Sequence, residues 1–190
     1  MIEKMRRMVL MKEGKNSKSK EINALLEISK AIASGLYLED VLRLIVTVTA
    51  NLMDSKICSL WILDEKEKVL RISATQTMSE EYLKERTLKL GEGVVGYVAR
   101  ENKPLAVLDV LKEPRYKEKE LARKENLVSM LSVPLAVKEK VIGVINCYTS
   151  YPHEFNETER AVLTAVANQA AICIENTELM VKTKVIQEEL

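Results

Sequence analysis

Side chains able to carry out chemistry are scarce in this sequence of 190 residues, which holds one histidine and three cysteines. His153 stands alone between Pro152 and Glu154, so a triad of serine, histidine and acid could be assembled only by forcing it into that role. The sequence contains no CxxC pair and no GxxxxGK[ST] phosphate loop. It therefore predicts no catalytic residue, no metal ligand and no cofactor.

The cysteines all lie in apolar runs, which is the usual setting of reduced core cysteines. They are Cys58, Cys147 and Cys173. An odd number of such residues favours the reducing cytoplasm. A redox enzyme that uses one of these thiols stays open as an alternative, and alkylation of the folded protein would test it.

A glycine-rich stretch at residues 91–96 matches the dinucleotide pattern GxGxxG. That pattern needs a surrounding parallel βαβ unit, and here it follows only a short strand-like run. A tight turn whose small residues let a helix pack closely on a sheet is the favoured interpretation.

Net charge gives no drive toward nucleic acid or an anionic membrane, because 29 basic residues face 28 acidic ones. The apolar run at residues 8–11 is too short for a signal peptide core, and no run approaches the ~20 apolar residues of a membrane span. Residues 12–20 are polar and basic, without periodicity or interleaved aromatics. Residues 1–20 are therefore expected to form a flexible basic leader rather than a nucleic-acid arm. We expect no nucleic-acid partner and no membrane partner.

The elements that must position the remaining side chains follow from hydrophobic periodicity. Apolar spacing predicts a helix from Glu21 that stops near Gly35, and a second helix over residues 38–53. A run rich in strand formers at residues 57–63, a polar turn at 64–67 and an alternating run at 69–75 predict a hairpin. The later elements are short strands at 87–90 and 104–107, a short helix after the glycine turn, a charged helix up to about 125, and a second hairpin formed by 128–137 and 141–148.

The last predicted helix begins after Asn156, which forms a capping-box pattern with Glu159, and continues almost to Leu190. At 1.5 Å per residue such a rod is about 50 Å long, which is more than a domain of this size needs for its own core. The segregated strands and helices predict an α+β fold: an antiparallel sheet of about five or six strands, with the N- and C-terminal helices on one face and short helices capping a pocket on the other.

Five segments, in this order and spacing, resemble a GAF domain, a sensor and dimerisation module of signalling proteins. They are residues 57–64, residues 90–99, Pro104-Leu105 with Asp109 and residues 114–116, residues 130–135, and residues 141–146. The resemblance covers residues 21–176, which leaves the leader at 1–20 and a helical extension at 177–190.

The resemblance implies a ligand pocket between the sheet and the short middle helices. Its positions in this sequence are Ser59, Trp61, Ala74, Val94, Val95, Asp109, Glu120, Arg123, Leu127 and Ser129. Strand alternation independently places Ser59, Trp61 and Leu63 on one face. These residues could equally be ordinary core.

Departures from the family pattern restrict the ligand. Ala74 replaces the aromatic and Leu127 the hydroxyl with which cyclic-nucleotide-binding members read their base. The Cys-His pair of bilin-binding members is absent, His153 is poorly placed as a haem ligand, and the glycine turn lacks the cysteines of the methionine sulfoxide reductase branch. A small uncharged or weakly anionic metabolite remains, or no ligand.

The expected function is a non-catalytic, cytoplasmic regulatory domain, homodimeric through its first and last helices, that couples ligand binding to helix geometry and serves an output domain or partner protein. The residues assigned to the dimer are Ile22, Leu25, Ile32, Leu163, Ala170, Ile174 and Val181. The alternative is a ligand-free dimerisation scaffold of the same fold.

Overall fold

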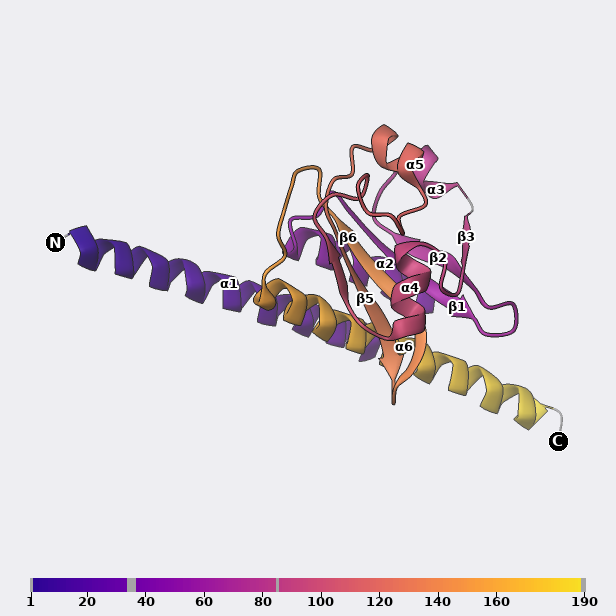
Figure 1. The fold of residues 1–190 in the computed structure, drawn as a ribbon. Coiled ribbons are helices and arrows are strands. Elements are labelled where there is room, and N and C mark those ends of the chain that lie inside the picture. The colour runs from indigo at the N-terminus through magenta and orange to yellow at the C-terminus, as the bar shows by residue number, and fades with distance from the viewer. Residues whose placement is uncertain (1, 34–36, 85, 189–190) are drawn as a thin grey trace.

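A six-stranded antiparallel sheet forms the centre of the computed structural model (Figure 1), with the strand order β3-β2-β1-β6-β5-β4. The structure describes the backbone of residues 2–33, 37–84 and 86–188, and within these ranges the side chains of residues 16–179. The strands are β1 Ile57–Asp64, β2 Val69–Thr75, β3 Thr87–Lys89, β4 Leu105–Val107, β5 Met130–Val137 and β6 Lys140–Tyr148. Both predicted hairpins and both predicted short strands are confirmed.

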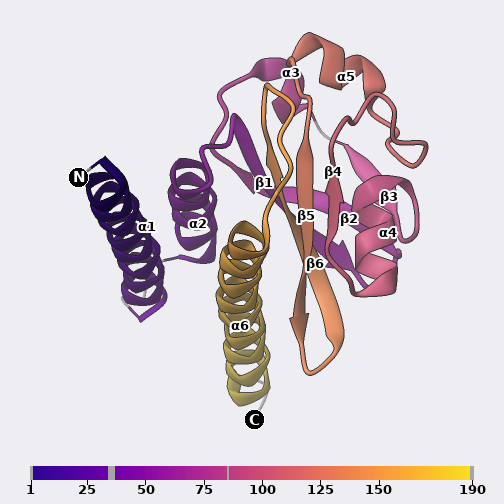
Figure 2. The same ribbon diagram turned by 60° about the vertical axis from the view of Figure 1, so that its left-hand side comes forward.

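Helices cover both faces of the sheet (Figure 2), as the sequence predicts. They are α1 Ile2–Ala33, α2 Leu38–Leu52, α3 Glu80–Leu83, α4 Gly93–Glu101, α5 Lys119–Lys124 and α6 Glu157–Glu188. Helices α2 and α6 pack on one face, with α1 against both of them, while α4 packs on the other face. Helix α3 is not predicted by the sequence pattern, because one helical turn is too short to show periodicity.

Two hydrophobic cores lie on opposite sides of the sheet. The first fills the space under α2 and α6 and includes Leu60, Ile145 and Leu163. The second lies under the short helices and includes Trp61, Val98 and Tyr148. Neighbouring residues of β1, such as Leu60 and Trp61, serve opposite cores because successive side chains of a strand alternate in direction.

The glycine turn before α4 requires residues without a side chain. Gly91 and Gly93 have φ angles of 86° and 66°, in the left-handed region. A Cβ at Gly96 would lie 2.3 Å from the carbonyl oxygen of Lys89. The interpretation of this stretch as a tight turn that brings a helix close to a strand is therefore confirmed.

Residues 2–20 form the first half of α1, which corrects the expectation of a flexible leader and of a helix that begins at Glu21. The physical reason is propensity. This stretch is rich in Lys, Glu, Met and Arg and contains no proline, and these residues favour a helix even without an apolar stripe. The predicted stop at Gly35 lies outside the described residues.

Helix α6 begins with the predicted capping box. The Asn156 side-chain oxygen accepts the Glu159 backbone N–H at 2.9 Å, and the Glu159 carboxylate accepts the Asn156 backbone N–H at 2.7 Å. Buried residues of α6 extend to Ile174, after which the helix continues beyond the sheet (Figure 1). Helices α1 and α6 run in the same direction, and the chain ends lie at opposite ends of the molecule.

Three residues assigned to a dimer contact serve the molecule's own core instead. Leu163, Ala170 and Ile174 are buried between α6, the sheet and α2. This corrects their assignment, because the apolar stripe of α6 packs on β5 within the same chain. Leu25 and Ile32 are partly buried against the same core, Ile22 is exposed, and the side chain of Val181 lies outside the described residues.

Candidate functional site

Four buried aromatic side chains gather between the sheet and the short helices, in a region that we call the aromatic compartment. They are Trp61 of β1, Tyr82 of α3, Tyr116 of the segment before α5 and Tyr148 at the end of β6. The ring of Tyr148 meets those of Tyr82 and Tyr116 edge to face, with centroids 6.5 and 6.4 Å apart. The compartment thus offers flat apolar surfaces with polar tips.

An ion pair closes one side of this compartment. Arg86 donates to Glu118 at 2.7 Å, and the two side chains are only 16% and 17% exposed. The guanidinium lies 4.5 Å from the centroid of the Tyr82 ring and 5.6 Å from that of Trp61, within cation–π range. Among the described residues, the buried Arg86 Nε has no hydrogen-bond partner. Such a donor is costly to leave unsatisfied and is the natural contact for an acceptor atom of a ligand.

Ser59 links the aromatic groups at the base of the compartment. Its hydroxyl oxygen accepts the Tyr82 hydroxyl at 2.9 Å and the Trp61 indole N–H at 3.3 Å. Burial raises the pKa of Tyr82 to about 12, and burial also raises the pKa values of Tyr116 and Tyr148. These phenols therefore remain neutral hydrogen-bonding groups at neutral pH.

Glu118 is the titratable carboxylate of the compartment. Burial raises its pKa above the ordinary value, although the Arg86 guanidinium opposes this by lowering it. A buried carboxylate with one strong cationic partner is sensitive to any group that competes for that partner.

The structure brings some of the predicted pocket residues together. Ser59 and Trp61 belong to the aromatic compartment, and the second core beneath it contains Val94, Val95 and Leu127. The predicted common face of Ser59, Trp61 and Leu63 is confirmed, since Leu63 also packs against the second core.

Ala74 lies on the opposite face of the sheet, in the first core, which corrects its assignment to the pocket. It pairs with Leu60, and residues directly opposite each other in an antiparallel pair share a face. A register irregularity at Leu60/Trp61 then places Ile72 opposite Trp61. Simple counting from the predicted hairpin could not reveal this irregularity.

Four further predicted residues lie outside the compartment. Asp109 pairs with Lys112 at 2.9 Å, and Glu120 and Arg123 form an ion pair with each other on α5. Ser129 donates to the Leu108 carbonyl at 2.6 Å and accepts the His153 backbone N–H at 2.8 Å. Their assignment to the pocket is therefore corrected, because their polar groups already bind partners in turns or on the surface.

Five residues of the compartment were not predicted: Tyr82, Arg86, Tyr116, Glu118 and Tyr148. Tyr116 and Tyr148 lie within segments quoted for the family resemblance or next to them, and Tyr148 faces the second core as Trp61 does. Arg86 and Glu118 stand in polar stretches without periodicity, where nothing distinguishes them from surface charges.

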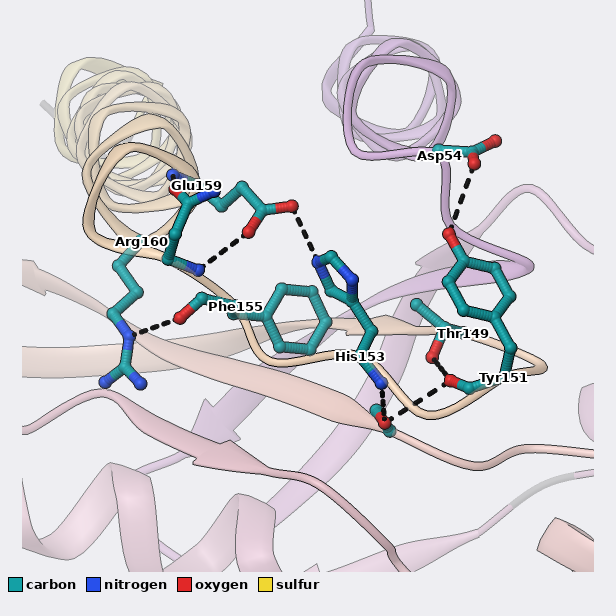
Figure 3. A network of polar contacts seen from close by, with 9 residues as sticks. Asp54, Thr149, Tyr151, His153, Phe155, Glu159 and Arg160 are labelled. Atoms are coloured by element: carbon teal, nitrogen blue, oxygen red, sulfur yellow. Dashed lines mark hydrogen bonds and ion pairs between the residues drawn. The ribbon is translucent and has the colours of Figure 1, made fainter.

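The junction between β6 and α6 is a second polar network (Figure 3). His153 contacts Glu159 at 2.7 Å, and its ring packs edge to face on Phe155 with centroids 4.8 Å apart. Tyr151 donates to Asp54 at 3.2 Å, next to the end of α2. His153 is thus half-buried and fixes the start of α6 to β5 through Ser129.

The thiols and the acidic groups offer little for catalysis. All three cysteines are buried, and burial raises the pKa values of Cys58 and Cys173, which disfavours the reactive thiolate. Within the described ranges, no three His, Cys, Asp or Glu side chains converge as a metal site would require. Within the same ranges, no helix is long and apolar enough to cross a membrane.

A curled antiparallel sheet, covered on one face by the helices of both chain ends and on the other by short helices over an aromatic compartment, defines a small α+β domain of the sensor class. Residues 36–175 match the family model of the GAF domain, and the chain belongs to this family.

Relatives of the chain are much longer proteins. It is 27% identical over 158 residues to a phosphoenolpyruvate-dependent phosphotransferase system protein of Escherichia coli strain K12, covering 83% of this chain and 21% of that protein. It is 26% identical over 153 residues to a Nif-specific regulatory protein of Herbaspirillum seropedicae, covering 78% of this chain and 28% of that protein. The chain thus spans about a fifth to a quarter of these relatives, and its similarity to a GAF domain of a regulatory protein supports a regulatory role.

A solved structure shows the same architecture. The GAF domain of a phosphoenolpyruvate-protein phosphotransferase from Acinetobacter superposes with a TM-score of 0.74 at 25% identity, covering 85% of this chain and 97% of that one.

Proposed function

We propose that this chain is a non-catalytic regulatory domain that binds a small molecule in the aromatic compartment and transmits its occupancy through α1 and α6 of a homodimer. The observation that carries the ligand proposal is the buried Arg86 Nε without a partner, set among aromatic faces. The regulatory part is supported by the similarity to the Nif-specific regulatory protein.

The chemistry of the compartment favours a small uncharged or weakly anionic ligand with a carbonyl or carboxylate oxygen. That oxygen would accept from Arg86, and an apolar body would lie against the rings of Trp61 and Tyr82. A carboxylate would compete with Glu118 for the guanidinium, so Glu118 would take up a proton when an anion binds.

A continuous set of contacts supports transmission to the helices. Trp61 lies on β1 and Tyr148 on β6, strands that pair with each other, while β5 and β6 pack against α6 on the reverse face. The junction of His153 with Ser129 and Glu159 holds the first turn of α6 to this sheet. A shift of these strands on ligand binding would therefore move α6 relative to α1.

We place the domain in the cytoplasm, without membrane or nucleic-acid partners, where it serves an output domain or partner protein. Its three cysteines, which are buried free thiols that form no disulfide among the described residues, suit a reducing compartment. The non-catalytic assignment is supported by the burial that disfavours thiolate formation, and rapid alkylation of any thiol in the folded protein would argue for a redox enzyme instead.

A thermal-shift screen of carboxylates, amino acids and nucleotides tests the ligand proposal. At a hundredfold excess over Kd, a ligand that binds only the folded state adds about 2.7 kcal/mol to the free energy of unfolding. Arg86→Gln should abolish the shift caused by any hit, whereas Lys112→Gln, on an exposed turn, should leave it unchanged.

The second candidate is a ligand-free dimerisation scaffold, favoured by the fact that the compartment's own aromatic rings contact one another. A scaffold predicts that no compound in the screen raises the melting temperature. It also predicts that Arg86→Gln alters only stability.

A further inference from the structure

The outer edge of β2 is open for half of its length. β2 has seven residues and β3 has three, and β3 pairs only with Val69, Leu70 and Arg71 (Figure 1). Among the described residues, no strand pairs with the outer side of residues 72–75. An open strand edge presents unpaired backbone N–H and C=O groups, which are a template for another extended chain.

Ser73 is the centre of this open edge. It is exposed and has no register partner on β1, because the pairing passes from Ala74 to Ile72 at the irregularity. No described strand pairs with its outer side, because β3 ends its pairing at Arg71.

A cleft of about 640 Å³ runs along the same edge. One wall is the beginning of α2, and the other is formed by Leu83, Lys84 and Arg86. The apolar lining residues are Leu38, Leu42, Ile62, Ile72, Ala74 and Leu83. The volume lies within the range of about 300–1,000 Å³ that is typical of ligand sites.

The charges of the cleft are mainly positive. Arg43 and Arg71 are exposed in it, and Lys84 adds a third cation that pairs with Glu81 at 2.7 Å. Arg86 also lines it but is committed to Glu118. Among the described residues that line the cleft, Glu39 alone is acidic. This imbalance favours an acidic occupant, although the chain as a whole is almost neutral.

We infer that this cleft, the β2-edge cleft, binds an extended acidic peptide segment of a partner protein, which adds as a strand to β2 beyond the end of β3. Four residues of strand span about 13 Å, so about four peptide residues pair with residues 72–75. Backbone hydrogen bonds supply affinity, and acidic side chains that reach Arg43 and Arg71 supply specificity. This inference does not depend on ligand binding in the aromatic compartment.

Fluorescence anisotropy with a labelled octapeptide of alternating Asp and Val tests the inference on the full chain. Saturable binding is expected, and it should weaken with added salt. The double variant Arg43→Glu with Arg71→Glu should raise the Kd about tenfold, because exposed ion pairs contribute up to ~1 kcal/mol each. The control Lys103→Glu makes the same type of change at an exposed position near the opposite sheet edge and should leave the Kd unchanged.

Two altered peptides separate strand addition from simple charge attraction. A peptide with Lys in place of Asp should not bind wild type. An Asp-Val peptide with alternate amides N-methylated keeps its charge but loses backbone donors, so its binding should be largely lost. Equal binding of either altered peptide would overturn the inference.

Hydrogen exchange of the wild type supplies a readout that does not depend on any variant folding. Amides of residues 72–75 should become protected when the Asp-Val peptide is added, whereas protection confined to other strands would contradict the inference. A doubled molar mass that the double variant abolishes would assign the edge to a second copy of the chain and would also overturn it.

Discussion

Burial decides the behaviour of individual charged residues, and Glu118 shows this most clearly. Its pKa is raised by desolvation, so the folded state binds the proton more tightly than the unfolded state does. The free energy of unfolding must then fall as the pH rises above the ordinary value of 4.5, through the window up to the raised pKa.

The variant Glu118→Gln should remove this pH dependence while keeping an acceptor for Arg86. Relative to wild type, the free energy of unfolding of this variant is expected to increase as the pH is raised from 4.5 to 8, by at most about 1.4 kcal/mol per pH unit inside the window. Its melting temperature relative to wild type should rise over the same range. Differential scanning fluorimetry across that range measures the difference. Glu120→Gln makes the same change at an exposed position and serves as the control for the loss of a carboxylate. A difference for Glu118→Gln that does not vary with pH would contradict the role assigned to its burial.

Two glycines are required for different reasons: Gly143 by close contact with a neighbouring strand, and Gly93 by its backbone conformation. A Cβ at Gly143 would lie 2.2 Å from the carbonyl oxygen of Trp61, whereas at Gly93 the nearest atom is 3.6 Å away but φ is 66°. Gly143→Ala should destabilise by about 3 kcal/mol, because β1 and β6 must separate, and Gly93→Ala by about 1–2 kcal/mol. Urea unfolding ranks the two, and a Gly93 variant less stable than the Gly143 variant would refute the assignment of close backbone approach.

At the scale of elements, strand alternation predicted β2 and helical spacing predicted the buried stripe of α6, because both patterns directly reflect burial. The strand-forming residues of β1, which is buried on both faces, predicted that strand, and the capping box predicted the beginning of α6. Periodicity did not predict the helix at residues 2–20, where helix propensity acts, or the single turn of α3. The compartment was only partly predictable, since Trp61 follows from strand alternation while Arg86 acquires its role from tertiary packing alone.

The capping box of α6 makes a measurable contribution to the free energy of unfolding. Asn156→Ala should cost about 1 kcal/mol, because the Glu159 N–H loses its side-chain acceptor, and Asn156→Ser should restore most of that loss. Asn176→Ala removes the same amide from an exposed position inside the helix and should be neutral or stabilising. Chemical unfolding of the three variants checks the order, and equal effects at positions 156 and 176 would show that the cap contributes nothing.

In the whole molecule, the two faces of the sheet are covered by different structures. The face under the short helices encloses the aromatic compartment, and the reverse face carries the layer formed by α1, α2 and α6 (Figure 2). The buried stripe of α6 is occupied by the molecule's own sheet, so any contact between copies must use other surfaces of these helices. On α1, Ile22 and Leu26 are 58% and 51% exposed one helical turn apart, and on α6 Ile172 is exposed.

These exposed apolar side chains are the expected dimer contact, which replaces the buried residues of α6 in the original assignment. Because each side chain is about half exposed, covering it adds about 1 kcal/mol, and a symmetric contact covers both residues in each of the two chains. The double variant Ile22→Glu with Leu26→Glu should therefore weaken dimerisation at least a hundredfold, and it should leave the fold intact because neither residue is buried.

Light scattering at micromolar concentration should give the mass of two chains for wild type and of one chain for the variant. Met78→Glu introduces a similar change at an exposed apolar residue between β2 and α3, outside these helices, and should remain dimeric. A wild-type mass of 21.5 kDa would contradict the homodimer, and a variant that remains dimeric would move the contact away from this face of α1.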